Sequence, residues 1–332
     1  MEHYERNPMT PAAPGSPIDK ILIKLPESMR ERINKLPKRA MNQLEEIRIR
    51  TDTDTLLISG GREYSLRDRD EITAEVLEEI LNRLLDYSYY AYEEELARGY
   101  ITIEGGHRVG ICGRVTLENG QVHLIKDVSS LNIRRSREIT GSSDKILGAV
   151  LSPAKTPPEG VQNAGDSAAI TEMNVRNTLI ISPPKCGKTT ILRDLARSLS
   201  CRGFRIGICD ERSEIAGCYD GKTSYDLGPR TDVLDGCPKA EGILMLIRAM
   251  SPDVVLTDEI GKPEDAAAIR SALSAGVKII TTIHGSSFED AAKSAVGDLI
   301  TDRVFETLIF LSAQPVTGTV EKILQLPEVS HG

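Results

Sequence analysis

The segment from Thr178 to Thr190 constrains the fold of this chain more than any other. It begins with a short apolar, β-branched run typical of a buried strand, continues through a turn containing Pro and Gly, and reaches Lys188 and Thr189 where a helical pattern starts. Such a loop directs backbone N–H groups and a helix N-terminus at phosphates, while the lysine reaches the terminal phosphates and the hydroxyl ligates Mg²⁺. The segment therefore predicts a site for a nucleoside triphosphate.

The loop departs from the usual spacing G-x-x-x-x-G-K-[ST] at one end. That spacing puts its first glycine at position 182, where this chain has a serine. The alternative is an ordinary strand-to-helix turn with a solvated lysine. The predicted phosphate-binding residues are Ser182, Pro183, Pro184, Lys185, Cys186, Gly187, Lys188, Thr189 and Thr190.

Three further apolar runs of the second half also end in residues of chemical interest. Their ends are Asp210-Glu211-Arg212, Asp258-Glu259 and His284. Parallel strands of an α/β sheet present ligand-binding groups at their carboxyl ends. Because helical patterns lie between the runs, we expect an α/β sheet whose strand ends meet at one site.

Each of these residues has a predicted role. Asp258 would hold Mg²⁺ through water together with Thr189, and Glu259 would polarise the attacking water as a catalytic base, with Lys188 on the phosphates. Glu211 would be a second acid near Mg²⁺, unless it forms a solvated ion pair. His284 would contact the γ-phosphate, unless it is a structural histidine.

The chain length of 332 residues allows two domains. Pro-rich residues 1–16 predict a disordered tail, residues 17–140 a smaller α+β domain, residues 141–172 a linker or inserted loop, and residues 173–332 the P-loop domain. In the first domain we expect a hairpin around Gly105-Gly106, and near the C-terminus a closing antiparallel hairpin.

Composition excludes several classes of protein. The net charge of −8 and the absence of Trp disfavour stable nucleic-acid binding, although a nucleic-acid-dependent ATPase stays open as a third reading. The six cysteines lack zinc-ligand spacing. No apolar run reaches the roughly 18 residues of a membrane span, so we expect a cytoplasmic protein.

The four motifs in this order resemble those of the additional-strand P-loop ATPases of the secretion and pilus-motor type, which are AAA+-like. The stretches Leu44–Arg50, Gly99–Val115 and Asp127–Arg134 resemble the stage III sporulation protein AA family of endospore-forming bacteria. The resemblance implies a RecA-like ATPase that uses ATP and Mg²⁺ and forms a ring, a hexamer by analogy. It also implies docking on a membrane-spanning sporulation complex, with membrane contact only through partners.

Two glycines of the family's loop pattern, G-P-P-G-C-G-K-T-T, are replaced here by Ser182 and Lys185. If position 185 requires positive φ, a lysine there costs on the order of 1 to 2 kcal/mol. We therefore expect retained but weakened ATP binding. The main prediction is a Mg²⁺-dependent ATPase that energises the complex, and the alternative is a nucleotide-binding scaffold with little turnover.

Overall fold

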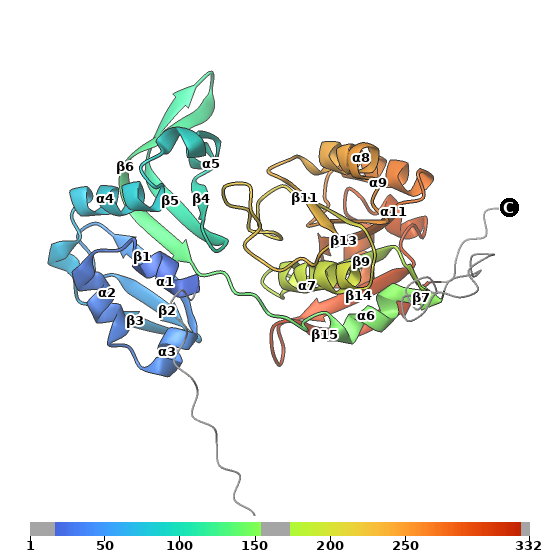
Figure 1. Cartoon of the computed structure of the whole chain (residues 1–332), viewed down its shortest axis with the longest axis horizontal. Helices are drawn as coiled ribbons and strands as arrows, with labels where there is room; N and C mark the ends of the chain where they lie inside the picture. Colours follow the sequence, from blue (N-terminus) through green and yellow to red (C-terminus); the bar gives the residue numbers. More distant parts are fainter. Residues whose placement is uncertain (1–16, 154–172, 327–332) are drawn as a thin grey trace, which may run out of the picture. The chain divides into compact units, whose positions relative to one another are not determined.

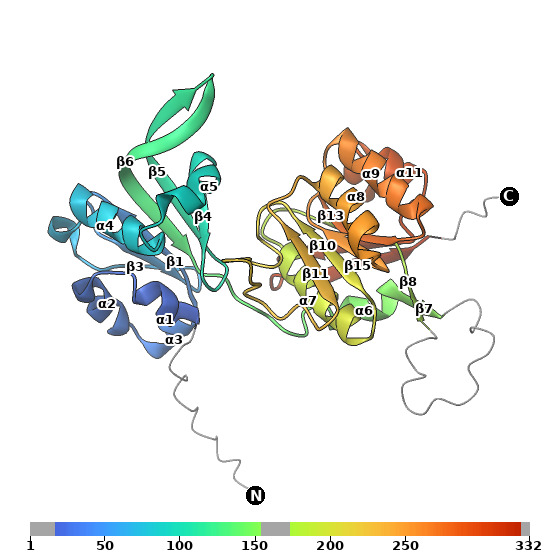
Figure 2. The same ribbon diagram turned by 45° about the horizontal axis from the view of Figure 1, so that its top comes forward.

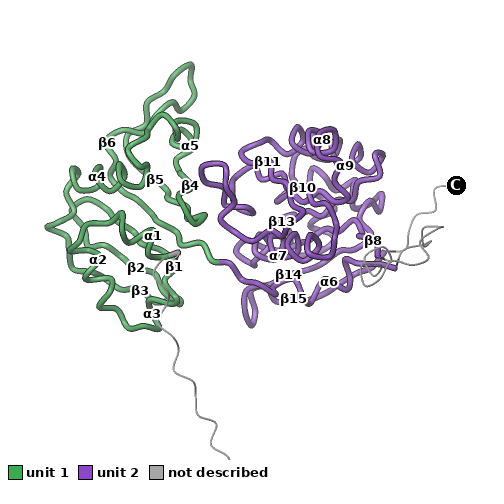
Figure 3. The backbone as a smooth tube through the Cα atoms, viewed as in Figure 1, with its two compact units in different colours: residues 1–137 green, residues 138–332 purple. Residues whose placement is uncertain are grey.

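The computed structural model describes residues 17–153 and 173–326. The chain divides into two compact units, residues 1–137 and 138–332 (Figure 3). The tail expected for residues 1–16 and the part of the expected linker from 154 to 172 lie outside the described residues.

Unit 1 combines helices with an antiparallel sheet (Figure 1). Its helices are α1 (Pro17–Leu22), α2 (Glu27–Asn34), α3 (Lys38–Asn42), α4 (Ala74–Leu84) and α5 (Glu93–Ala97), with 3₁₀ turns η1 (Arg69–Glu71) and η2 (Tyr89–Tyr92). Its strands are β1 (Leu44–Arg50), β2 (Leu56–Ser59), β3 (Arg62–Ser65), β4 (Tyr100–Ile103), β5 (His107–Glu118) and β6 (Gln121–Arg134), in the order β3-β2-β1-β6-β5-β4.

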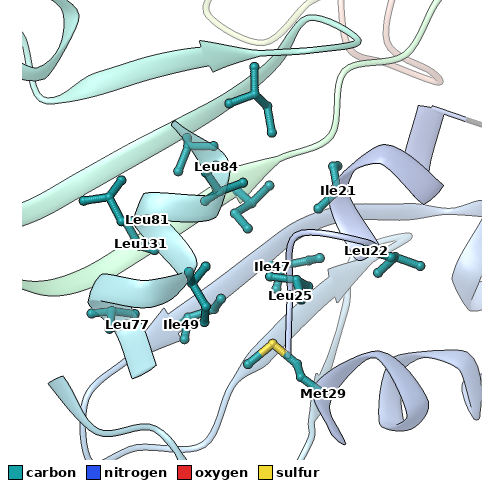
Figure 4. Close-up of a cluster of buried hydrophobic side chains, with 14 of the residues drawn as sticks. Ile21, Leu22, Leu25, Met29, Ile47, Ile49, Leu77, Leu81, Leu84 and Leu131 are labelled. Atoms are coloured by element: carbon teal, nitrogen blue, oxygen red, sulfur yellow. The ribbon is translucent and has the colours of Figure 1, made fainter. Parts of the chain in front are cut away.

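The core of unit 1 lies between the sheet and its helices. Helix α4 places Leu77, Leu81 and Leu84 on one face, as expected for residues three and four apart. These side chains pack with Ile47 and Ile49 of β1 in a single cluster of buried residues (Figure 4). Burial of this stripe holds the helix against the sheet.

The hairpin predicted around Gly105-Gly106 is confirmed, because β4 and β5 pair antiparallel with Ile103 opposite His107. Beyond the predicted hairpin, β5 continues to Glu118 and pairs with β6 as a long ribbon, which extends away from the helices in both views (Figures 1 and 2). The signal for this extension was present in the sequence, since the ribbon turns at Asn119-Gly120 with φ of 50° and 78°. That dipeptide favours the tight turn of a hairpin.

Unit 2 alternates strands and helices. Its helices are α6 (Asp144–Val150), α7 (Lys188–Cys201), α8 (Lys239–Met250), α9 (Pro263–Ser274), α10 (Phe288–Ala292) and α11 (Asp298–Thr301). Its strands are β7 (Leu151–Pro153), β8 (Met173–Val175), β9 (Thr178–Ser182), β10 (Ile206–Asp210), β11 (Thr231–Asp235), β12 (Val254–Thr257), β13 (Lys278–His284), β14 (Thr307–Ser312) and β15 (Thr319–Gln325).

The main sheet of unit 2 has the order β11-β10-β12-β13-β9-β14-β15. All strands of this sheet except β15 run parallel to one another. Strand β15 closes the sheet antiparallel to β14, as the expected closing hairpin requires. Both faces are covered: in β9, Ile180 packs in the cluster with α6 and α7, whereas Leu179 and Ile181 pack in the cluster with α8 to α11. Burial on both faces explains the unbroken apolar runs of these strands.

Two parts of unit 2 differ from the expected organisation. Residues 144–153, expected in a linker, form α6 and β7, because Ile146, Leu147 and Val150 are buried against the sheet. Strand β11 was not predicted, since this edge strand is only partly buried and carries acidic residues. Such a strand lacks the apolar run that identifies its neighbours.

Candidate nucleotide site

The predicted phosphate loop joins the end of β9 to the start of α7. Ser182 is buried and its hydroxyl donates to the Pro183 carbonyl oxygen at 2.9 Å. The backbone turns through positive φ at Lys185, 61°, and at Gly187, 84°. The condition for strain at Lys185 is therefore met, whereas Ser182 is not among the described residues with positive φ.

Gly187 suits this position mainly by its positive φ, and space beside it is limited. A Cβ atom there would lie 3.3 Å from Thr317 Cγ2 and 3.4 Å from the Gly318 nitrogen. The loop thus packs closely on the turn between β14 and β15. Thr189 and Thr190 follow in the first turn of α7, where both are half-buried, and Cys186 is buried below them.

Lys188 reaches back across the loop. Its ammonium donates to the carbonyl oxygens of Ser182 at 3.0 Å and Pro183 at 3.3 Å, and its Nζ lies 3.2 Å from Nδ1 of His284. Burial lowers the pKa of Lys188, partly opposed by the negative charge of Glu259. The lysine is therefore desolvated and held beside the strand ends.

His284 connects this lysine to Glu259. Its Nε2 lies 2.9 Å from Oε1 of Glu259. Since the ammonium of Lys188 can only donate, Nδ1 of His284 accepts and Nε2 carries the proton that Glu259 accepts. The backbone N–H of Glu259 donates to Oγ1 of Thr282 at 2.9 Å, so β13 orients both ends of this contact.

Parallel pairing brings these groups together. His284 lies opposite Ser182 in the register of β13 and β9, and Thr257, the last residue of β12, lies opposite Thr281. Strand β10 is the neighbour of β12 on its other side. The four strand ends expected to meet are thus consecutive in the sheet, while the roles assigned to their residues remain predictions.

Asp258 and Glu211 share a buried lysine that the sequence analysis did not single out. Lys239, the first residue of α8, forms an ion pair with Glu211, and its Nζ lies 3.4 Å from Oδ1 of Asp258. Burial opposes the charge of Lys239, but Asp258 and Glu211 together raise its pKa. Burial raises the pKa of Asp258, which Lys239 partly offsets.

Asp210 fixes the loop that follows β10. Its fully buried carboxylate accepts from the backbone N–H groups of Glu214, Ile215 and Ala216 at 2.8 to 2.9 Å. Burial raises its pKa to about 7, although the backbone donors favour the ionised form. Arg193 of α7, stacked 3.6 Å from the Tyr225 ring centroid, donates to the carbonyl oxygens of Ile215 and Glu214 at 2.7 Å.

Arg193 and Lys239 could not be assigned from local sequence. Arg193 lies inside the helix after the loop, and Lys239 follows a strand that was not predicted. The only local signal for Lys239 is Pro238 before it, which is favoured near helix starts. Their partners come from segments about 20 or more residues away.

The residues present fit a magnesium ion bound with a nucleotide. Oδ1 of Asp258 is buried and makes no hydrogen bond, so it is available to a water of the ion. The described residues contain no cluster of three or more His, Cys, Asp or Glu side chains arranged for a metal. Such an ion would therefore be held mainly by phosphate oxygens, with Thr189 and Asp258 as protein partners.

Comparisons with known proteins identify the family of the chain. A family profile described as "Sporulation stage III, protein AA" matches residues 18–158 and 159–327. Stage III sporulation protein AA of Bacillus subtilis (strain 168) is 44% identical over 306 residues, which cover 90% of this chain and 92% of the relative.

Solved structures share the fold at low identity. The pilus retraction motor PilT with bound ADP aligns with a TM-score of 0.53 at 13% identity, over 82% of this chain and 76% of that one. The Yersinia pseudotuberculosis ATPase DotB aligns with a TM-score of 0.50 at 13% identity, over 86% and 76%. The predicted fold class, a RecA-like α/β domain preceded by a smaller α+β domain, is confirmed, and the chain belongs to the family of sporulation stage III protein AA.

Proposed function

We propose that the chain is an ATP-binding, Mg²⁺-dependent ATPase that works as the motor subunit of a membrane-spanning sporulation complex. The observation that carries the proposal is the contact chain from Lys188 through His284 to Glu259. It joins the lysine proposed to bind phosphate to a carboxylate able to polarise water, across the ends of the three adjacent strands β9, β13 and β12. Family membership and the fold of a pilus motor with bound ADP support the same conclusion.

The loop residues would bind the phosphates. Positive φ at Lys185 and Gly187 curves the backbone from Ser182 to Thr190, and the N-terminus of α7 adds its dipole. Lys188 would exchange the carbonyl oxygens of Ser182 and Pro183 for phosphate oxygens, which are stronger acceptors.

Glu259 would act as the base for the attacking water. Its carboxylate is partly exposed, so water can reach it, and the Nε2 proton of His284 orients it, while the Thr282 hydroxyl oxygen holds the backbone N–H of Glu259. The contact of His284 with Lys188 would therefore depend on whether the lysine ammonium binds phosphate or the carbonyl oxygens of the loop. A bound Mg²⁺ would neutralise charge on the phosphate oxygens during transfer.

Assembly and location are part of the proposal. A motor of this type needs subunits that meet at the nucleotide, so we propose a homo-oligomeric ring, a hexamer by analogy, in the cytoplasm. Its partners would be membrane-spanning sporulation proteins, with no stable nucleic-acid contact. Among the helices of residues 17–153 and 173–326, none has the length and apolar character needed to cross a bilayer.

Phosphate release tests the proposal. ATP turnover should occur with Mg²⁺, stop in EDTA, and fall at least about tenfold in Asp258→Asn, which keeps the volume of the side chain but weakens its hold on a metal-bound water. Asp232→Asn, at an exposed position of edge strand β11, is the matched control and should leave turnover unchanged. Turnover that is equal in Mg²⁺ and EDTA would contradict the proposal.

The alternative is a nucleotide-binding scaffold with little turnover. The observation that favours it is Lys185, which occupies a left-handed position with φ of 61° in the loop. A scaffold would bind ATP and form the ring, but release phosphate at the background rate. Light scattering with and without ATP and Mg²⁺ tests the ring in either case.

A further inference from the structure

The carboxylates behind the phosphate loop lie around one buried ammonium. Glu211 follows β10, Asp258 follows β12, and Lys239 begins α8 between them. The side chain of Lys239 is 8% exposed, that of Asp258 9% and that of Glu211 29%. Three elements therefore meet at a largely buried charge cluster.

The ammonium does not satisfy both carboxylates equally. Lys239 makes a hydrogen bond to Glu211, whereas Oδ1 of Asp258, at 3.4 Å, accepts none. A buried carboxylate oxygen without a hydrogen bond destabilises the fold, because it has lost its contact with water. Oδ1 of Asp258 therefore lies beside the charge of Lys239 and still has room for a further donor.

The negative charges around Asp258 favour a cation beside it. Besides burial, the negative charge of Glu214 raises the pKa of Asp258, which Arg212 partly offsets, and Asp258 and Asp235 in turn raise the pKa of Asp210. Lys239 is the closest cation to Asp258 that the described residues provide. A divalent ion and this ammonium would therefore compete for the same carboxylate.

We propose that Lys239 is the internal counter-ion of the magnesium site, pairing with Asp258 when no divalent ion is bound and yielding Asp258 to the ion when nucleotide arrives. The inference rests on the proposed function, because it assigns a positioning residue to that same site. Glu211 retains the ammonium throughout, so Lys239 stays charged and paired in both states.

The substitution Lys239→Met tests this, because it keeps the length of the side chain and removes its charge. Mn²⁺ alone, titrated without nucleotide and followed by electron paramagnetic resonance, should bind Lys239→Met at least about tenfold more tightly than the natural chain. Lys239→Arg keeps a positive charge and should bind Mn²⁺ as weakly as the natural chain does. Equal Mn²⁺ affinity in the natural chain and Lys239→Met would overturn the inference.

Nucleotide binding supplies a second readout. The ratio of ADP affinity with Mg²⁺ to that without should rise in Lys239→Met, since nucleotide alone would meet two uncompensated carboxylates. A merely structural role would weaken both affinities together and leave the ratio unchanged, which would also overturn the inference. If the natural chain binds no nucleotide, the proposed function fails, while the Mn²⁺ titration still tests Lys239.

The substitution Lys239→Met also destabilises the fold, because it leaves buried carboxylates without their counter-ion. If that variant does not melt cooperatively, the same comparison is made between Glu211→Gln and Glu211→Gln/Lys239→Met. The second of these has one buried carboxylate fewer to compensate. Tighter Mn²⁺ binding in the double variant supports the inference, and equal binding overturns it.

Discussion

The phosphate loop and the strand ends behind it are built in different ways. Pro183, Pro184 and Lys185 are exposed, and the path of the loop depends on backbone conformation at two positive-φ residues. The strand ends hold buried charges in networks such as Asp210 with its three backbone donors. The loop can therefore tolerate a changed side chain if its backbone path is kept, whereas the strand ends depend on specific partners.

The largest effect on binding should come from Lys188→Ala. Loss of a charged phosphate contact is worth about 1.5 to 3 kcal/mol, so ATP affinity should fall by roughly 10- to 100-fold in a fluorescent-nucleotide titration. Lys222→Ala removes an exposed lysine outside the loop and is the control. If both substitutions weaken binding equally, Lys188 has no special position.

His284→Ala should lower turnover about tenfold or more while ATP affinity changes little. The substitution removes the donor that orients Glu259, whose role arises during the chemical step. His284→Gln, which restores a side-chain donor, should recover part of the rate. A rise in KM with an unchanged kcat would instead indicate that His284 only binds nucleotide.

Asp194→Asn tests the anchoring of α7 behind the loop. The carboxylate of Asp194 accepts from the backbone and hydroxyl of Ser143 at 2.8 and 2.6 Å and pairs with Arg197 at 2.8 Å. The variant should lose about 1 to 3 kcal/mol of unfolding free energy at pH 7, measured by urea denaturation. Asp298→Asn, at an exposed ion pair with Arg270, should change it by less than about 1 kcal/mol.

The pH dependence of Asp194→Asn has a defined sign. Burial opposes ionisation of Asp194, but hydrogen bonds from Ser143 and Arg197 outweigh it and lower the pKa from 3.8. The ionised form thus stabilises the fold above pH 3.8, and this contribution is lost as the pH falls through the lower folded value. The difference in unfolding free energy between the natural chain and Asp194→Asn should therefore become smaller as the pH falls through this range. A difference that stays constant would show that the ionised carboxylate of Asp194 does not stabilise the fold.

The smallest effect should come from relief of strain at Lys185. Because φ is already positive in the folded chain, Lys185→Gly should raise the unfolding free energy by about 0.5 to 1 kcal/mol relative to Lys185→Ala. Melting curves of the two variants measure this difference. If ATP affinity rises in Lys185→Gly but not in Lys185→Ala, the strain at this position acts in the nucleotide-bound state and not in the nucleotide-free fold.

Sequence patterns predicted the features that depend on local periodicity and order. Four strand ends carrying Lys188, Asp210, Asp258 and His284 were expected to meet, and parallel pairing makes their strands neighbours. The apolar runs sufficed because both faces of each strand are buried.

The features of the fold and the site that could not be predicted from the sequence depend on tertiary contacts. Residues 144–153 resembled a linker because prolines and glycines follow closely, yet Ile146 and Val150 are buried. The preceding Pro238 indicated only a helix start at Lys239 and not its burial, since the partners Glu211 and Asp258 come from two other elements. A charged residue at a helix start is usually solvated, and only the assembled sheet explains its burial.

The central claim is that Glu259 acts on water at an ATP site formed by these strand ends, and single-turnover hydrolysis of ATP tests it most directly. Natural chain and Glu259→Gln are compared at ATP concentrations that give equal occupancy, with Mg²⁺ present. If Glu259 is the base, hydrolysis should be at least about 100-fold slower in Glu259→Gln, with ATP affinity retained. Equal hydrolysis rates in the two proteins would contradict it.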